Sequence, residues 1–417
     1  MKKIVFIIID GLSDKPLVQL GKKTPLEAAK TPNLDWLAEN GICGQVQPFQ
    51  FSWQRFPESD AAHLALFGYD PQKYYLGRGV YEAAGIGAYL RRGDVALRVN
   101  FATVDKNLKL KNRRAGRISE TQSLINSLDG RKINGVKFLL KKSLSYRAVL
   151  ILRGKNLSKE ITDGDPHETG KKVLRIKPKI KKAEFTAKVL NEFLERAYLV
   201  LKNHPFNKKR KKRGLPVANY LLVRGAGQFK KIPSFKKRYK LSAACVAGGP
   251  LYKGIAKILG MDLIKVRGAT GLLNTNLKGK FSAVKKALYP VKSAKGGAAK
   301  PQFNRVKKYN FLFCHIKAAD SLAEDGNFRA KKEFIEKIDK NLKPILQLKN
   351  TLIVVTADHS TCSNLKRHCS LPVPVLIYGS KIKPDKAAKF SERACQKGRL
   401  GKMKGLDLMK KVLLYNH

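Results

Sequence analysis

The stretch that decides the fold runs from Thr351 to His368 and reads TLIVVTADHSTCSNLKRH. Its apolar run, Leu352 to Val355, is rich in β-branched residues and has the length of a buried strand in a parallel sheet. Asp358 and His359 follow where this strand is expected to end, and open α/β sheets bind their ligands at that edge. A carboxylate beside an imidazole, with His368 further on, is typical of a site for Mn²⁺, Mg²⁺ or Zn²⁺. The same pattern also fits an aspartate that caps a helix next to a surface histidine.

A second strand end with a carboxylate lies near the start of the chain. Lys3 to Ile9 is an apolar run that predicts a buried strand, and Asp10 and Gly11 follow it. An aspartate at a strand end suits a metal ligand, and glycine permits a close approach of the backbone. An ordinary turn after a strand has the same sequence. The run is too short for the apolar core of a signal peptide, so no leader is expected here.

Ser59 lies where a helix is predicted to begin, and Ala61 to Phe67 continues that helix. A serine at this position usually caps the helix. The alternative is a nucleophile, because a helix N-terminus stabilises an alkoxide and a bound phosphate, and a metal would complete the activation. The turn Leu76 to Gly79 then presents Arg78 to an anion.

Two more carboxylates follow the predicted strand Asn310 to Ile316. Asp320 and Glu324 are four residues apart, so on one helical turn they face the same way and can share a metal. A solvated acidic turn is the alternative. The amphipathic segment Phe328 to Leu346 predicts one helix that leads into the strand at 352–355.

The segment between residues 80 and 235 has a different character. It contains a predicted strand at Val95 to Val104, where residues alternate, and a predicted helix at Ala183 to Lys202. Arginines lie in turns or beside glycine, such as Arg113, Arg117 and Arg224. Arginine is well suited to clamp a carboxylate or a phosphate. Each one alone is typical of a surface charge, but together they favour an anionic substrate. We therefore predict a discontinuous metal-binding domain, residues 1–79 and 236–417, with an inserted substrate-binding domain at residues 80–235.

The net charge of +54 in 417 residues attracts anions of every kind. Lysines occur in almost every segment, which is more typical of a solvated surface than of a nucleic-acid site, and no zinc-finger spacing or internal repeat supports one. No apolar run approaches the ~18–20 residues of a membrane span. The six cysteines form no CxxC pair, which predicts free thiols in a reducing cytoplasm and no structural zinc site.

The candidate metal and nucleophile residues together resemble the site of the alkaline phosphatase superfamily. A closer resemblance is to the archaeal-type 2,3-bisphosphoglycerate-independent phosphoglycerate mutase family. In chain order it is carried by PLEAAKTPNLDWLAENGICG, ESDAAHLALFGYDP, YYLGRGVYEAAGIGA, NFATVD, RRAGRI, TDGDPHE, PLYKGIA, GATG and TADHSTCSNLKRH. These segments run nearly from end to end of the chain in a single order.

This resemblance implies an alkaline-phosphatase-like α/β fold, a mostly parallel sheet flanked by helices, with a smaller inserted α/β or α+β domain. It implies interconversion of 3-phosphoglycerate and 2-phosphoglycerate without 2,3-bisphosphoglycerate, through a phosphoserine. Two divalent ions, Mn²⁺ or Mg²⁺ with Zn²⁺ or Co²⁺ as alternatives, would clamp the reacting oxygens. The expected protein is a cytoplasmic enzyme of glycolysis and gluconeogenesis with a small-molecule substrate and no membrane or specific nucleic-acid partner.

The resemblance also implies roles for particular residues. Ser59 is the implied nucleophile. One metal is expected at Asp10, Ser59, Asp358 and His359, and the other at Asp320, Glu324 and His368. Substrate is expected at Arg78, Arg113, Arg117, Arg153, Arg224 and Lys253, and Asp165 or His167 is expected to move the hydroxyl proton.

Three residues depart from the pattern of this family. Glu324 stands where histidine is usual, and an oxygen ligand there favours Mg²⁺ or Mn²⁺ over Zn²⁺. Glu58 replaces the usual glycine before the nucleophile, and Ala319 replaces the usual threonine before Asp320. Two other functions therefore stay open: a metal-dependent phosphatase or other phosphomutase, and a catalytically weakened protein that binds RNA through its charge.

Overall fold

The computed structural model describes residues 3–290 and 308–416. The chain forms two compact units, Met1–Tyr75 with Pro233–His417, and Leu76–Ile232. The first predicted boundary, after residue 79, lies four residues beyond the observed one after residue 75. The second, after residue 235, lies three residues beyond the observed one after residue 232. Arg78 consequently belongs to the second unit.

The first unit is built on an eight-stranded sheet with the order β10-β9-β11-β1-β12-β15-β2-β16. The strands from β10 to β12 in this order are parallel, β15 is antiparallel to both of its neighbours, and β16 is parallel to β2. This confirms the predicted α/β fold with a mostly parallel sheet. The strands are β1 (Lys3–Ile9), β2 (Ile42–Gln47), β9 (Ala243–Val246), β10 (Asp262–Leu263), β11 (Phe311–Ile316), β12 (Thr351–Thr356), β15 (Val373–Tyr378) and β16 (Gly401–Lys404).

The three central strands of this sheet end at one edge. Residues 4–9 of β1 are fully buried, as expected for a strand covered on both faces. In the parallel register, Ile9 of β1 lies beside Ile316 of β11, and Ile8 lies beside Thr356 of β12. The polar residues that follow the three strands are therefore brought together.

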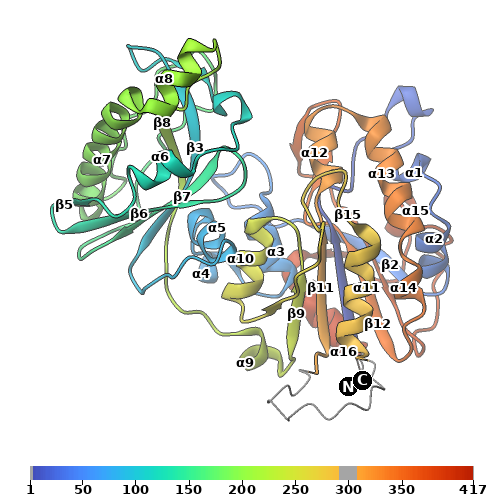
Figure 1. Cartoon of the computed structure of the whole chain (residues 1–417). Helices are drawn as coiled ribbons and strands as arrows, with labels where there is room; N and C mark the ends of the chain where they lie inside the picture. Colours follow the sequence, from blue (N-terminus) through green and yellow to red (C-terminus); the bar gives the residue numbers. More distant parts are fainter. Residues whose placement is uncertain (1–2, 291–307, 417) are drawn as a thin grey trace, which may run out of the picture. The chain divides into compact units, whose positions relative to one another are not determined.

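Helices cover both faces of the sheet (Figure 1). Helix α3 packs against α10 and α16, whereas α2 packs against β2, β15 and α13. The helices of this unit are α1 (Pro25–Ala28), α2 (Pro32–Glu39), α3 (Ser59–Leu66), α4 (Pro71–Tyr74), α9 (Phe235–Tyr239), α10 (Pro250–Ile258), α11 (Leu277–Leu288), α12 (Ala318–Glu324), α13 (Phe328–Lys340), α14 (Lys343–Leu346), α15 (Glu392–Gln396) and α16 (Gly405–Leu414).

The prediction of a single helix from Phe328 to Leu346 is wrong. Helix α13 ends at Lys340 with Asn341 as its C-cap, and α14 begins at Lys343. Pro344 lies in the first turn of α14. Because proline has no N–H and its ring clashes with the carbonyl four residues earlier, a continuous helix is disfavoured there.

The second unit is an antiparallel sheet covered by a long helix, which agrees with the predicted α+β insertion. The sheet has the order β4-β3-β7-β6-β5, and β8 also pairs with β3. The rings of Phe138 on β6 and Phe193 on α7 stack with centroids 4.3 Å apart. The elements are α5 (Arg78–Gly85), β3 (Val95–Val104), β4 (Leu110–Asn112), α6 (Gln122–Asn126), β5 (Lys132–Ile133), β6 (Val136–Lys142), β7 (Arg147–Arg153), α7 (Glu184–Asn203), α8 (Pro205–Lys212) and β8 (Tyr220–Gln228).

A short hairpin in the first unit follows Asp358 and His359. Its strands, β13 (Ser360–Cys362) and β14 (Arg367–Cys369), are joined by a disulfide between Cys362 and Cys369. The prediction of free thiols is therefore wrong for this pair. No motif links the two residues, but antiparallel pairing brings their Cα atoms to 6.1 Å, which is within the range of a disulfide. The free and buried cysteines are Cys43, Cys245, Cys314 and Cys395.

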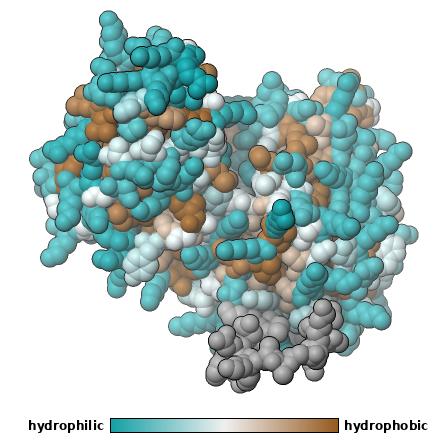
Figure 2. All heavy atoms as spheres, in the orientation of Figure 1, coloured by the Kyte–Doolittle hydropathy of each residue, from teal (hydrophilic) through white to brown (hydrophobic). Residues whose placement is uncertain are grey.

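Hydrophilic residues cover most of the face shown in Figure 2, and apolar residues are interspersed among them. Among the residues that the structure describes, no helix is both long and apolar enough to cross a bilayer.

Candidate active site

Three residues at the ends of central strands form the first candidate metal group. Asp10, Asp358 and His359 each place a donor atom within 4.8 Å of the others, and all three are buried. Gly11 donates its backbone N–H to Asp358 Oδ1 at 3.2 Å. Its φ is +62°, and a Cβ there would lie 2.5 Å from Thr361 Oγ1, so the close approach requires glycine.

The second candidate metal group consists of Asp320, His359 and His368. Asp320 lies on α12 and accepts a hydrogen bond of 2.7 Å from the hydroxyl of Thr361. The ring of His368 stacks on His359 with centroids 3.8 Å apart. His368 uses Nδ1 to contact the carbonyl of Pro57 at 2.8 Å, and its Nε2 lies 3.5 Å from Asp320 Oδ1. His359 thus belongs to both groups.

Ser59 is the first residue of α3 and is buried. Its Oγ lies 3.0 Å from His359 Nε2. The N-cap is Glu58, and Ser59 is not itself the cap. The alternative role of Ser59 as a helix cap is therefore wrong, and its hydroxyl lies beside the residue shared by the two metal groups.

Lys317 is the principal positive charge at this edge of the sheet. Its Nζ lies 3.1 Å from Asp10 Oδ2 and 2.7 Å from Asp320 Oδ2. Burial would raise the pKa of both carboxyls, but the charge of Lys317 holds each pKa below its usual range. For Asp358, burial followed by repulsion from Asp10 raises the pKa to about 7. Three buried carboxyls in one place favour additional cations.

The two histidines of the metal groups have opposite pKa shifts. Burial, followed by repulsion from His368, lowers the pKa of His359 to about 4. Burial also disfavours charge on His368, but its hydrogen bond to Asp320 raises the pKa to about 10. His359 is therefore in the neutral form that binds metals.

Aromatic side chains lie around the carboxylates of the first metal group. Tyr252 donates its hydroxyl to Asp10 Oδ2, and His315 Nε2 lies 3.3 Å from the same oxygen. His63 Nδ1 contacts the carbonyl of Ser59 at 2.7 Å and lies 3.5 Å from Asp358 Oδ2. We did not predict these three roles from the sequence, although a histidine inside an apolar strand, as at His315, was a usable signal. Such outer contacts fix the orientation of metal ligands.

The donor atoms fit a pair of divalent cations. Asp10 Oδ1 and Asp358 Oδ2 are buried and have no hydrogen-bond partner in the described part of the chain. They lie 3.5 and 3.4 Å from His359 Nε2. A buried carboxylate oxygen without a partner is unfavourable, and a cation between these atoms would satisfy both. Oxygen and imidazole donors suit Mn²⁺, Mg²⁺ or Zn²⁺.

Glu324 lies at the C-terminal end of α12, outside both groups. Its side chain is exposed, yet its partial burial and the charge of Asp320 raise its pKa. Asp320 and Glu324 share one helix, as predicted, but the role of Glu324 as a ligand stays a prediction.

In the second unit, four arginines surround one buried carboxylate. Burial would raise the pKa of Glu82, but Arg98, Arg78, Arg147 and Arg224 lower it. Glu82 Oε1 lies 3.7 Å from Arg98 and 3.6 Å from Arg78. We call these five residues the arginine cluster. Its charges do not balance, which indicates a site for an anion.

The strand register sharpens this imbalance. Arg98 on β3 lies directly opposite Arg224 on β8, and like charges in that position repel. Burial, followed by repulsion from Arg78, lowers the pKa of Arg224. Within the described residues, the Nε atoms of Arg98, Arg147 and Arg224 are buried without a hydrogen-bond partner. A carboxylate or phosphate would supply the missing acceptors.

Asp165 and His167 lie next to this cluster. Asp165 is buried and accepts two hydrogen bonds from Arg113, of 3.2 and 2.7 Å. Burial would raise its pKa, but the bond to Arg113 lowers it. The backbone N–H of His167 donates to Asp165 Oδ1 at 2.9 Å, and burial lowers the pKa of the imidazole of His167.

The other predicted substrate residues lie elsewhere. Arg117 is on an exposed turn, and Arg153 forms a salt bridge of 2.7 Å with Asp94 at the opposite end of β7 from Arg147. Lys253 lies on α10 in the first unit. We did not predict Arg98 and Arg147, although a charge inside the predicted strand Val95 to Val104 was a usable signal for Arg98.

Comparisons with known proteins agree on one family. Residues 38–207 match the family described as 2,3-bisphosphoglycerate-independent phosphoglycerate mutase. A protein of that name from Methanocaldococcus jannaschii is 44% identical over 99% of this chain and 96% of its own length. A protein of the same name from Archaeoglobus fulgidus is 42% identical over 97% of this chain and 96% of its own length. The structure of a cofactor-independent phosphoglycerate mutase from Thermoplasma acidophilum has a TM-score of 0.69 at 33% identity and covers 100% of both chains. A Pyrococcus horikoshii structure has a TM-score of 0.81 at 34% identity, over 99% of this chain and 96% of that one.

Proposed function

The chain belongs to the family of 2,3-bisphosphoglycerate-independent phosphoglycerate mutases, and on this premise we propose that it interconverts 3-phosphoglycerate and 2-phosphoglycerate. The substrate carries a phosphate and a carboxylate. The chain offers a metal-binding carboxylate and histidine site in one unit and the arginine cluster in the other. The arginine cluster is complementary in charge to such an anion, and divalent ions bound by the carboxylates and histidines would be complementary to the phosphate.

Ser59 carries the phosphoryl group in this proposal. Its Oγ forms a bond to phosphorus as the bond to the 3-oxygen of glycerate breaks, and the 2-oxygen then takes the phosphoryl group back. Asp10, Ser59, Asp358 and His359 would hold one divalent ion, and Asp320, His368 and Glu324 would hold the other. When bound, two such ions neutralise charge on the phosphoryl group and activate the serine hydroxyl.

The observation that carries the proposal is the position of Ser59. Its Oγ lies at the N-terminus of α3 and 3.0 Å from His359, which belongs to both candidate metal groups. A helix N-terminus favours a bound phosphate, so phosphorylated Ser59 would be stabilised there.

Asp165 and His167 are the candidates for moving the proton of the 2-hydroxyl. Arg113 favours the ionised form of Asp165, and burial favours the neutral form of His167, so either side chain can accept a proton. Asp165→Asn and His167→Gln distinguish them. The variant that lacks the proton-transferring side chain should have a lower kcat with little change in KM, and the other variant should retain its kcat.

The direct test is an assay of phosphoglycerate interconversion without added 2,3-bisphosphoglycerate, in Mn²⁺, in Mg²⁺ and after EDTA treatment. We expect activity that requires a metal. Acid-quenched mass spectrometry should find a phosphopeptide containing residue 59 in the wild type and none in Ser59→Ala, which should also be inactive. A phosphopeptide that survives the substitution would remove Ser59 from this role. Release of inorganic phosphate in place of 2-phosphoglycerate would indicate a phosphatase.

A further inference from the structure

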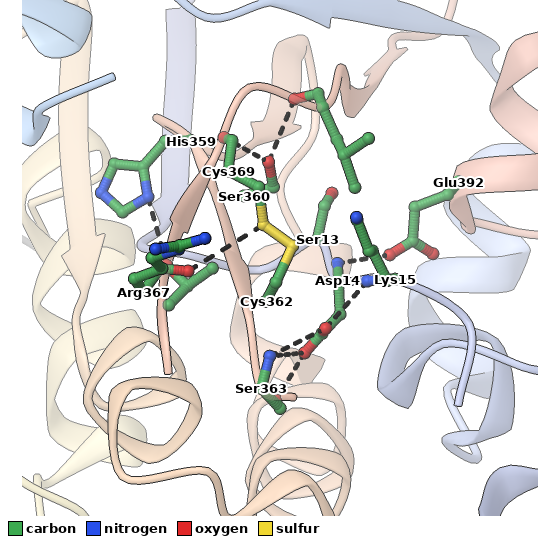
Figure 3. The surroundings of a disulfide bond; sticks show 12 residues. Ser13, Asp14, Lys15, His359, Ser360, Cys362, Ser363, Arg367, Cys369 and Glu392 are labelled. Carbon is green, nitrogen blue, oxygen red and sulfur yellow. Dashed lines mark hydrogen bonds between the residues drawn. A yellow bond between two sulfur atoms is a disulfide. The ribbon is translucent and has the colours of Figure 1, made fainter. Parts of the chain in front are cut away.

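The hairpin that carries His368 is closed by a covalent bond. Figure 3 shows the bond between Cys362 on β13 and Cys369 on β14. In the sequence, His368 immediately precedes Cys369. In the pairing of the two strands, His368 lies opposite Thr361, whose hydroxyl contacts both Asp320 and His359. Cys369 of the disulfide is therefore adjacent to His368, one donor of the second metal group.

The first strand of the hairpin is anchored independently of the disulfide. Thr361 donates its N–H to the carbonyl of Ser13 at 3.0 Å and accepts a hydrogen bond of 2.9 Å from Lys331 at its own carbonyl. Ser363 donates its N–H and its hydroxyl to the carboxylate of Asp14, which Figure 3 shows beside the hairpin. Strand β13 is thus held to the loop after β1 and to α13.

The backbone of the second strand has fewer anchors among the described residues. It is held by pairing with β13 and by the hydroxyl of Ser360 on the carbonyl of Cys369. The other contacts of this strand are made by side chains: Arg367 lies over the ring of Phe56, and His368 contacts the carbonyl of Pro57, stacks on His359 and lies near Asp320. Each strand is only three residues long, and a two-stranded hairpin of this size is marginally stable by itself. The position of His368 consequently depends on the disulfide more than the positions of Asp320 and His359 do.

We propose that Cys362 and Cys369 form a reversible thiol–disulfide site that positions His368 for metal binding. The disulfide form holds the second metal group together, and reduction by a dithiol loosens it. This inference rests on the proposed metal-dependent function. The pair acts through His368 and does not contact the reacting atoms.

A dithiol reductant supplies the two electrons that open the disulfide. Its first thiolate attacks Sγ of Cys369, the Cys362–Cys369 bond breaks, and Cys362 leaves as a thiolate that takes up a proton. The second thiol of the reductant then displaces Cys369, so the protein gains two thiols and the reductant leaves as a disulfide. Glutathione disulfide reverses the reaction. The residues on either side, Arg367, His368 and Ser370, reach solvent, whereas Cys369 is 5% exposed and Cys362 fully buried, so Cys369 is the easier of the two for a reductant to reach when the hairpin opens.

The test compares the oxidised, reduced and reoxidised full-length protein, stripped with EDTA and desalted. Alkylation in denaturant counts the thiols, calorimetric titration with Mn²⁺ gives the affinity of each metal site, and hydrogen exchange reports on residues 360–369. Cys362→Ala/Cys369→Ala is the permanently open variant. Cys245→Ala, which removes a free buried thiol and keeps the disulfide, is the matched control.

We expect four alkylated thiols in the oxidised protein and six after reduction. Reduction should weaken one Mn²⁺ site by roughly 10-fold, the loss typical of a supporting residue, and leave the other unchanged. Exchange should increase in β14 more than in β13, and reoxidation should restore both. The open variant should match the reduced wild type, and Cys245→Ala should respond as the wild type does.

Six alkylated thiols before reduction, or equal Mn²⁺ affinities in the two forms, would overturn the inference. Neither measurement depends on a substituted variant folding correctly, because the oxidised and reduced forms of the wild type share one sequence. Neither needs turnover, either. A protein that shows the redox shift in Mn²⁺ affinity but no phosphoglycerate interconversion would refute only the proposed function.

Discussion

At the level of single residues, Glu324 tests how the second metal is held. It lies one helical turn after Asp320, with its side chain exposed. If Glu324 is a ligand, Glu324→Ala should weaken one metal by roughly 10–100-fold, and Glu324→His should shift the preference from Mg²⁺ and Mn²⁺ towards Zn²⁺. Calorimetric titration measures both. Asp325→Ala removes the adjacent exposed carboxylate and is the control. Identical affinities in all four proteins would show that Glu324 is a bystander.

Arg224 separates substrate binding from stability. It lies opposite Arg98, and burial lowers its pKa, so its charge is unfavourable in the absence of an anion. Arg224→Gln should raise KM about 10–100-fold, the loss expected for a charged hydrogen bond, without lowering Tm. Arg153→Gln should do the opposite, because Arg153 is paired with Asp94 and lies outside the arginine cluster. Steady-state kinetics and thermal melts report the two effects, and the reverse pattern would count against the anion site.

At the level of elements, Lys331 ties α13 to two loops at the metal edge. Its fully buried Nζ donates to Asp14 at 3.0 Å, to the Ser13 carbonyl at 3.2 Å and to the Thr361 carbonyl at 2.9 Å. Lys331→Met should lower the free energy of unfolding by about 3–5 kcal/mol, because it leaves Asp14 buried without its cation.

The next residue supplies the control for this element. Lys332 pairs with Glu336 at 2.8 Å on the more exposed side of the same helix. Lys332→Met should cost only about 0.5 kcal/mol, as is usual for such pairs. Urea denaturation followed by circular dichroism measures both variants. Equal losses would mean that α13 is not anchored through Lys331.

At the level of the whole molecule, the net charge of +54 should act on the rate of substrate capture. Hydrophilic residues dominate the face in Figure 2, and the charge is spread along the chain. The positive charge attracts an anionic substrate over a screening distance that shortens as salt is added, to about 10 Å at 0.1 M. Because capture is then less favoured, kcat/KM should decrease with KCl while kcat changes little. Sucrose at matched viscosity is the control for slower diffusion. A kcat/KM that does not respond to KCl would show that the charge has no part in capture.

Much of the fold could be predicted because strands show as apolar runs or as alternation, and helices as amphipathic spacing. The strands Lys3–Ile9 and Val95–Val104 have the predicted ends, and the helix at Ala183 to Lys202 lies within one residue of α7. The helix start at Ser59 was also predicted, from its position before an apolar run. These signals are local, since burial on one or both faces dictates the pattern of neighbouring residues.

The sequence by itself determined that Asp10, Asp358 and His359 follow buried strands, and parallel strands end at one edge of a sheet. Only the tertiary structure decided which distant residues meet: Arg98 with Arg224, Lys331 with Asp14, Tyr252 with Asp10, and Cys362 with Cys369. Each of these contacts depends on strand register or on how a helix packs, and a shift of one residue would place the side chain on the other face. Local sequence does not encode that choice, because it is made by the packing of the whole core.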